Sequence, residues 1–159
     1  MTEPIEFALV PLDRLRPHEQ FVEAELHRLI RRIRSKGEFD NPIWVSRGSY
    51  VILNGHHRVE ALRRLGAVLA PAWVVDYHGA IVRLDRWSPG PPISKEEVER
   101  RAAEGRLFPP KTTRHHLLTE PPPRRTYLAD LLPGGSAPRP YEPSAEPSAR
   151  PRAGASRVR

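Results

Sequence analysis

The strongest local feature of this sequence is Leu53-Asn54-Gly55-His56-His57-Arg58, at a junction between a strand and a helix. It follows an apolar run at residues 51–53 that is typical of a buried strand, and it leads into a helical pattern over residues 56–65. The first turn of a helix leaves backbone N–H groups unpaired and carries the positive end of the helix dipole. The junction therefore predicts a phosphate site, with packing alone as the alternative role, made of Gly55, His56, His57 and Arg58.

Further strands and helices are expected on both sides of this junction. Apolar residues recur at helical spacing over residues 24–36, and Gly37 follows at the position of a left-handed cap. Ser94-Lys95-Glu96-Glu97 has the capping-box pattern, which predicts a third helix as far as Glu104. Strand patterns occupy residues 7–11, 42–46, 49–53, 72–75 and 81–84. This order predicts a small α+β domain with a mixed sheet and about three helices.

The composition divides the chain into a folded part and a tail. Six of the 19 prolines lie in residues 133–159, where there is no Ile, Leu, Phe or Trp. Such a segment cannot bury enough apolar surface to offset the entropy lost on ordering. We therefore predict a folded domain over residues 1–132 and a disordered, basic Pro/Arg-rich tail over residues 133–159.

Charge and residue content limit the classes of function. The formal net charge of +7 suits anionic partners such as nucleotides, phosphorylated metabolites or nucleic acid, although a solvated basic surface explains it equally well. The absence of cysteine excludes disulfides, thiolate zinc sites and thiol nucleophiles. No apolar run approaches the ~18 residues of a membrane span, and no signal peptide opens the chain. We expect a cytoplasmic protein with no membrane partner.

Two other segments carry groups suited to chemistry. Residues 108–115 are predicted to form an ordered loop, because their prolines forbid a helix. This loop ends in Lys111-Thr112-Thr113-Arg114-His115, whose donors suit a phosphate or carboxylate, with a solvated basic loop as the alternative. Glu19, in Arg16-Pro17-His18-Glu19, is a carboxylate able to take a proton from a hydroxyl, or else a surface residue. No histidine pair has metal-ligand spacing.

In this order, the three segments resemble the ParB/sulfiredoxin-like superfamily, in which a strand, Gly-x-x-Arg and a helix form a nucleotide-phosphate site. Sulfiredoxins carry Gly-Cys-His-Arg, which a chain without cysteine lacks, and ParB proteins typically carry Gly-Glu-Arg-Arg. The sequence is most similar to the free L-serine kinases, which use ADP in archaea or ATP in bacterial relatives. The shared stretches are residues 16–19, Leu53-x-Gly-His-His-Arg-x-x-Ala-Leu62, residues 93–96, and Gly-x-Leu-Phe-Pro-Pro-Lys-Thr-Thr-Arg-His at residues 105–115.

This resemblance implies a phosphotransferase that converts free L-serine to O-phospho-L-serine with ADP or ATP. Glu19 would be the general base, and Gly55, His56, His57 and Arg58 would hold phosphates that Mg²⁺ bridges. Serine or its phosphorylated product would be bound by Lys111, Thr112, Thr113, Arg114 and His115.

The chain departs from the kinase pattern at Asn54, where the kinases usually have Asp. Asparagine keeps an N-cap hydrogen bond but lacks the charge that holds Mg²⁺ or assists the base. The alternative function is a non-catalytic ParB-like regulator that senses nucleotide or associates with DNA. The arginines of the tail bind polyanions without specificity, which leaves nucleic acid open as a partner without favouring it. The oligomeric state also stays open.

Overall fold

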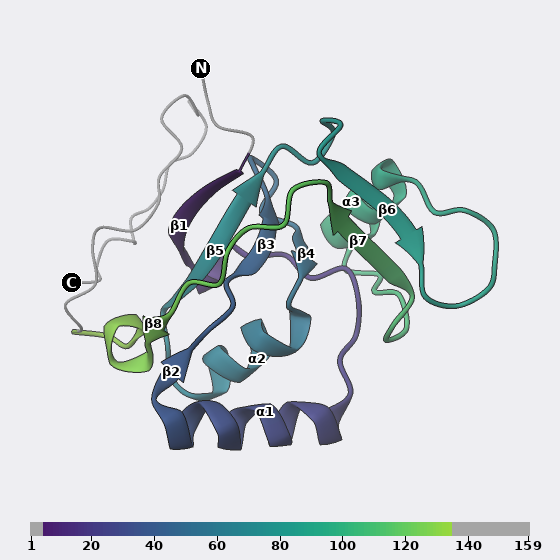
Figure 1. Ribbon diagram of the computed structural model, residues 1–159. Coiled ribbons are helices and arrows are strands. Elements are labelled where there is room, and N and C mark those ends of the chain that lie inside the picture. The colour runs from purple at the N-terminus through teal and green to yellow at the C-terminus, as the bar shows by residue number, and fades with distance from the viewer. Residues whose placement is uncertain (1–4, 135–159) are drawn as a thin grey trace.

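Four strands form a mixed sheet at the centre of the fold, in the order β1-β5-β3-β4 (Figure 1). A computed structural model describes residues 5–134. Strand β1 (Ile5–Pro11) lies antiparallel to β5 (Leu69–Val75), which lies parallel to β3 (Ile43–Ser46). Strand β4 (Ile52–Asn54) pairs antiparallel with β3 at the edge. The predicted α+β class with a mixed sheet is confirmed.

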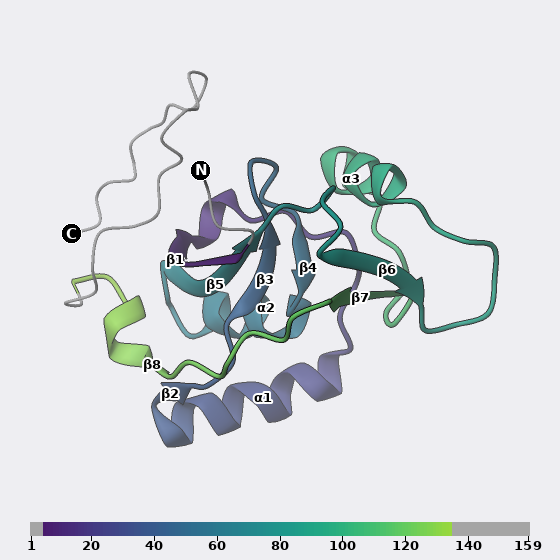
Figure 2. The ribbon, with the colours of Figure 1, turned by 45° about the horizontal axis from the view of Figure 1, so that its top comes forward.

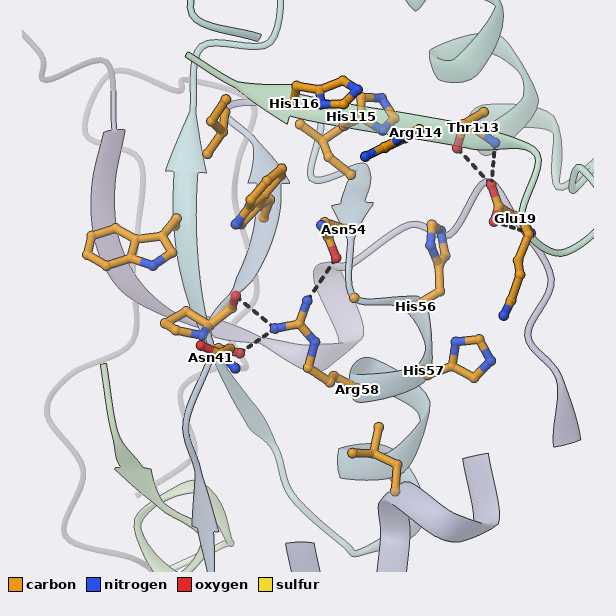
Figure 3. A pocket seen from close by; sticks show the side chains of 18 of the residues that line it. Glu19, Asn41, Asn54, His56, His57, Arg58, Thr113, Arg114, His115 and His116 are labelled. Atoms are coloured by element: carbon orange, nitrogen blue, oxygen red, sulfur yellow. Dashed lines mark hydrogen bonds between the residues drawn. The ribbon is translucent and has the colours of Figure 1, made fainter. Parts of the chain in front are cut away.

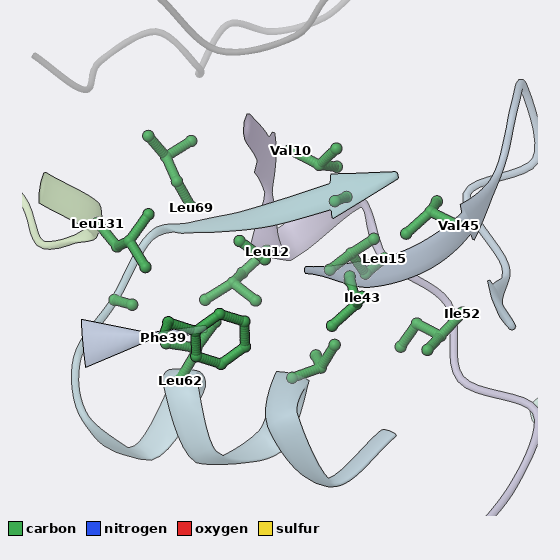
Figure 4. Packing of buried hydrophobic residues seen from close by; sticks show 14 of the residues in the cluster. Val10, Leu12, Leu15, Phe39, Ile43, Val45, Ile52, Leu62, Leu69 and Leu131 are labelled. Atoms are coloured by element: carbon green, nitrogen blue, oxygen red, sulfur yellow. The ribbon is translucent and has the colours of Figure 1, made fainter. Parts of the chain in front are cut away.

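Two helices cover one face of this sheet. Figure 1 shows α2 (His56–Arg64) between the sheet and α1 (Glu23–Lys36). The buried side chains of α1 are Leu26, Ile30 and Ile33, as the spacing predicted, and the helix ends at Gly37, whose φ of 69° is left-handed. Apolar side chains of both helices form one core with those of β3, β4 and β5. Figure 4 shows the part of this core around Leu62 of α2.

The opposite face of the sheet is covered only in part. Strands β6 (Val82–Arg86) and β7 (Thr113–Leu117) pair antiparallel and, with α3 (Lys95–Glu104), lie beside β4 (Figure 2). Their apolar residues form a second buried cluster with Leu53 of β4 and Val75 of β5. Helix α3 begins as predicted, because the Ser94 side chain accepts a hydrogen bond from Glu97 N. Among residues 5–134, the rest of this face is open to a cavity that Trp44 and Trp73 line.

Two local predictions are wrong. The loop predicted over residues 108–115 gives way to strand β7 at Thr113, because the chain beyond its prolines pairs with β6. The predicted hairpin is present, since β3 and β4 pair antiparallel, but its predicted turn at Arg47-Gly48 is too short, because β4 begins at Ile52. The intervening Val51 accepts a hydrogen bond from Ser46 N at 3.0 Å and also forms a parallel bridge with Arg16.

The chain also has short elements that the sequence did not predict. Strands β2 (Glu38–Phe39) and β8 (Thr126–Tyr127) pair with each other, and the 3₁₀ helices span Leu12–Arg14 and Leu128–Leu131. The side chain of Leu131 is fully buried in the main core. The predicted tail at 133–159 lies, apart from its first two residues, outside the described residues. Within residues 5–134, no helix has the length and apolar run needed to cross a membrane.

Candidate active site

A cavity of about 960 Å³ lies between the open face of the sheet, the start of α2 and strand β7. It brings together segments that are far apart in the sequence (Figure 3). Of the predicted site residues, only Thr112 is missing from its lining, because its buried hydroxyl donates to the Pro109 carbonyl at 2.7 Å. The others line the cavity: Glu19, Asn54, Gly55, His56, His57, Arg58, Lys111, Thr113, Arg114 and His115.

Gly55 sets the geometry of the strand-to-helix junction. Its φ of 114° is in the left-handed region, and a Cβ there would lie 2.6 Å from Ile43 Cγ2. Both observations exclude a side chain at this position without strain. Gly55 is the N-cap residue of α2, and the helix has no side-chain cap. The expectation that Asn54 supplies the cap is therefore wrong, and no side chain caps the N–H groups that open the helix.

The two histidines at the start of α2 hold the loop that carries Glu19. His56 Nε2 accepts a hydrogen bond from His18 N at 3.2 Å, and His57 Nε2 accepts one from Val22 N at 2.9 Å. An imidazole nitrogen that accepts a backbone N–H carries no proton, so the proton of each neutral ring is on Nδ1. Burial lowers the pKa of both rings, which favours this neutral form.

Arg58 points to the other side of the junction. Its guanidinium donates to the carbonyls of Asn41 and Pro42, and to Asn54 Oδ1 at 2.9 Å (Figure 3). Burial lowers the pKa of Arg58 to about 10, so the group is still charged at neutral pH. Arg58 thus joins α2 to the start of β3 while keeping a positive charge beside the cavity.

Three hydrogen bonds orient the carboxylate of Glu19. Its Oε1 accepts from Thr113 N at 3.0 Å and from Thr113 Oγ1 at 2.7 Å. Its Oε2 accepts from Lys111 N at 2.7 Å. Each carboxylate oxygen has two lone pairs, so Oε1 is fully occupied and Oε2 keeps one lone pair free. The arrangement fixes the direction of the carboxylate and leaves one oxygen able to accept a proton.

Backbone pairing fixes the loop that carries this carboxylate. Arg16 is hydrogen-bonded to Tyr50 and Ile52, which attaches the loop to the edge of the sheet. Further along, Phe108 N donates to His18 O at 2.8 Å, and Gln20 N donates to Phe108 O at 2.9 Å. Glu19 therefore sits between two short stretches of paired backbone.

The sequence analysis missed His18, which lies behind the carboxylate. The side chain is fully buried, and its Nε2 is 2.9 Å from Thr113 Oγ1. Because that hydroxyl gives its one proton to Glu19, His18 Nε2 is the donor to it. Burial lowers the pKa of His18 to about 4. Its position next to Glu19 in the sequence was the available signal.

The segment predicted to bind the substrate faces in several directions. Lys111 Nζ forms an ion pair with Glu25 at 2.9 Å, and the Thr113 hydroxyl is engaged by Glu19 and His18. His115 is buried, with its Nε2 2.9 Å from the Tyr77 hydroxyl. Arg114 is exposed, and its guanidinium lies 4.2 Å from the centre of the Trp87 ring. Lys111 and Arg114 are thus the two exposed cations of the segment, and Lys111 is paired with a carboxylate whereas Arg114 lies against an aromatic ring.

Comparison with known proteins identifies the class. The chain belongs to the ParB N-terminal domain family, which matches residues 3–82.

Two curated relatives are similar in sequence. The ADP-dependent L-serine kinase SerK of Thermococcus kodakarensis is 34% identical over 109 residues, which cover 65% of this chain and 45% of that enzyme. The ATP-dependent L-serine kinase of Staphylothermus marinus is 38% identical over 89 residues, which cover 54% of this chain and 35% of that enzyme. The chain thus spans less than half the length of either relative.

A solved structure is similar in fold. A free serine kinase in complex with AMP superposes with a TM-score of 0.74 at 21% identity, covering 82% of this chain and 95% of that one. The fold implied by the sequence resemblance is therefore confirmed.

Proposed function

We propose that this protein is a nucleotide-dependent L-serine kinase. The observation that carries the proposal is the carboxylate of Glu19, which three hydrogen bonds orient into the same cavity as the uncapped start of α2. Phosphoryl transfer needs a base that accepts the proton of the attacking hydroxyl and a site that binds the phosphates. The kinase names of the two curated relatives support serine as the acceptor.

In the proposed reaction, the serine hydroxyl attacks the terminal phosphorus of the nucleotide. The serine oxygen forms a bond to phosphorus, and the bond to the bridging oxygen breaks, so the electron pair leaves with AMP or ADP. The hydroxyl proton goes to Oε2 of Glu19, the oxygen with a free lone pair. The N–H groups of α2 and the charge of Arg58 stabilise the phosphate oxygens. Arg114 would pair with the serine carboxylate.

Mg²⁺ would bind chiefly through the phosphates. Within the part of the chain that the structure describes, no three His, Asp or Glu side chains are grouped as metal ligands. Mg²⁺ commonly takes one or two protein oxygens and completes its shell with phosphate oxygens and water, and this set of residues fits that pattern. Asn54 is the residue that would contact the ion, through the lone pair of Oδ1 that Arg58 does not occupy, and as a neutral ligand it would hold the ion more weakly than a carboxylate. When bound, Mg²⁺ supplies charge neutralisation on the phosphates.

A direct assay tests the proposal and identifies the donor. Protein, Mg²⁺ and L-serine are incubated with ADP or with ATP, and products are resolved by ³¹P NMR and mass spectrometry. We expect O-phospho-L-serine together with AMP or ADP, and the nucleoside product names the donor. Nucleotide binding without any phosphoserine would contradict the proposal and favour the non-catalytic regulator.

A further inference from the structure

We infer that the outer face of α1 binds a nucleic-acid duplex through its phosphates. The inference goes beyond the proposed function and holds whether or not the protein is a kinase, because it concerns a different surface and a different ligand. This surface, called the arginine face below, consists of Arg28, Arg31, Arg32 and Arg34.

The place of α1 in the fold leaves the arginine face uncovered. Figure 1 shows α1 as the outer layer of the fold, with α2 between it and the sheet. The apolar side chains of α1 face inward and belong to the main core. The arginines at 28, 31 and 32 have the spacing of one helix face, and all four members of the arginine face are exposed. The face is therefore open to a partner as large as a duplex.

The charges of the arginine face are not neutralised within the fold. Among residues 5–134, none of its four guanidinium groups takes part in an ion pair or a hydrogen bond. The two glutamates of α1 are engaged elsewhere, since Glu23 pairs with Arg64 at 2.7 Å and Glu25 pairs with Lys111 at 2.9 Å. Like charges three and four residues apart on a helix repel each other. A ligand that neutralises several of these charges at once relieves that repulsion.

The residue type favours phosphate as the ligand. A guanidinium group binds two phosphate oxygens in a fixed geometry, which a lysine ammonium does not. With a rise of about 1.5 Å per residue, the face extends for about 9 Å from Arg28 to Arg34. Each strand of a duplex carries a phosphate charge for about every 3.4 Å of its axis. The arginine face can therefore contact several phosphates together.

Two other polyanionic surfaces fit less well. A single strand is held largely by stacking of its bases on aromatic rings, and residues 23–36 include no Phe, Tyr or Trp. A membrane-surface helix inserts its apolar face into the lipid, and the apolar face of α1 is buried in the core. A duplex presents its phosphates on the outside and needs neither of these features.

Salt-dependent binding of a labelled DNA duplex, measured by fluorescence anisotropy on the full chain, tests the inference. Arg28 and Arg32 also line the cavity, so the test variant is the double substitution Arg31→Gln and Arg34→Gln. The matched control is the double substitution Arg83→Gln and Arg100→Gln, on β6 and α3. These two arginines are also exposed and, within residues 5–134, form no ion pair or hydrogen bond through their side chains. Both variants remove the same charge, and both keep the basic residues of the tail.

We expect the α1 variant to bind the duplex about tenfold more weakly at low salt. Each lost phosphate contact should reduce the slope of log K against log salt concentration by about 0.9, so the two substitutions together should reduce it by about 1.8. The control variant should keep the wild-type slope. Glutamine is a good helix former, so the melting temperature of the α1 variant should match that of wild type.

Three outcomes would overturn the inference. Wild type that binds no duplex at low salt would do so, and so would an equal loss of affinity in the two variants, since that result shows an effect of net charge alone. Displacement of the duplex by polyglutamate as effectively as by unlabelled duplex would identify an acidic protein as the partner instead. None of these outcomes depends on serine phosphorylation, so the proposed function is tested separately.

Discussion

The two sides of the α2 start hold their side chains by different means. On one side, Glu19 is oriented by three hydrogen bonds, and two of its three donors are backbone N–H groups. On the other side, Arg58 donates to the carbonyls of Asn41 and Pro42 and to Asn54 Oδ1. A proton-accepting oxygen must point in one direction, whereas the positive charge of a guanidinium attracts an anion from any direction. In the proposed kinase, this difference assigns proton transfer to the Glu19 side and anion binding to the Arg58 side.

The largest expected effect comes from removing the negative charge of Glu19. Glu19→Gln keeps the shape of the side chain but cannot take a proton, so turnover should fall by roughly 10²–10⁴-fold. Affinity for the nucleotide should hardly change, because the carboxylate faces the acceptor. Steady-state kinetics and nucleotide titration measure the two quantities. Glu104→Gln, at the far end of α3, is the control and should keep its turnover. Near-wild-type turnover in Glu19→Gln would show that Glu19 is not the base.

Acid should lower the free energy of unfolding through the buried histidines that lie behind Glu19. Burial lowers the pKa of His18 to about 4 and that of His115 to about 3, from an ordinary value of 6.5. Below pH 6.5 the unfolded chain binds protons that the folded chain does not. The free energy of unfolding should therefore be level above pH 6.5 and fall toward pH 4, by up to about 1.4 kcal/mol per pH unit for each histidine.

Denaturant unfolding at a series of pH values measures this loss. His18→Gln is the matched variant, because it removes one of the histidines whose pKa burial lowers and should make the decline shallower. A free energy of unfolding that stays level between pH 6.5 and pH 4 in wild type would contradict the prediction.

A smaller effect is expected when the hydroxyl beside Glu19 is removed. Thr113→Val deletes the link between Glu19 and His18 but keeps the backbone donor, so turnover should fall about ten- to hundredfold. The KM for serine should change little, and Thr113→Ser should retain most of the activity. A raised KM for serine with unchanged turnover would show instead that Thr113 binds the substrate.

The smallest effect is expected at Asn54, between the two sides. Asn54→Asp adds a hard oxygen ligand, so Mg²⁺-dependent activity should rise a few-fold. Stability should hardly change, because the Arg58 guanidinium that donates to Asn54 Oδ1 can pair with the new carboxylate. Nucleotide titration with and without Mg²⁺ measures the outcome. Weaker binding in both conditions, with no phosphoserine formed, would favour a regulator that needs a neutral residue here.

Local patterns were enough to predict much of the fold. The spacing of apolar residues and Gly37 located α1, and the capping pattern at Ser94 located α3, because both signals lie within one helix. Strand β7 was missed, because the prolines before it hid a strand whose pairing partner, β6, is distant in sequence.

The candidate site was predicted less fully, for the same reason. The sequence indicates that Thr113 and Arg58 offer donors, but it does not show where those donors point. Thr113 is engaged by Glu19, 94 residues away, and Arg58 by the carbonyls at 41 and 42. Such contacts depend on how the elements pack, which no local pattern records. His18 was overlooked because its role exists only once Thr113 lies against it.

The anchoring of the Glu19 loop by His56 and His57 restricts how the proposed kinase could evolve. One turn of α2 both lines the cavity and accepts the backbone N–H groups of His18 and Val22. A substitution in that turn would alter nucleotide binding and the orientation of the Glu19 carboxylate together, so selection could not change one without disturbing the other. New donor preferences would arise more readily at residues of the cavity that do not hold this loop.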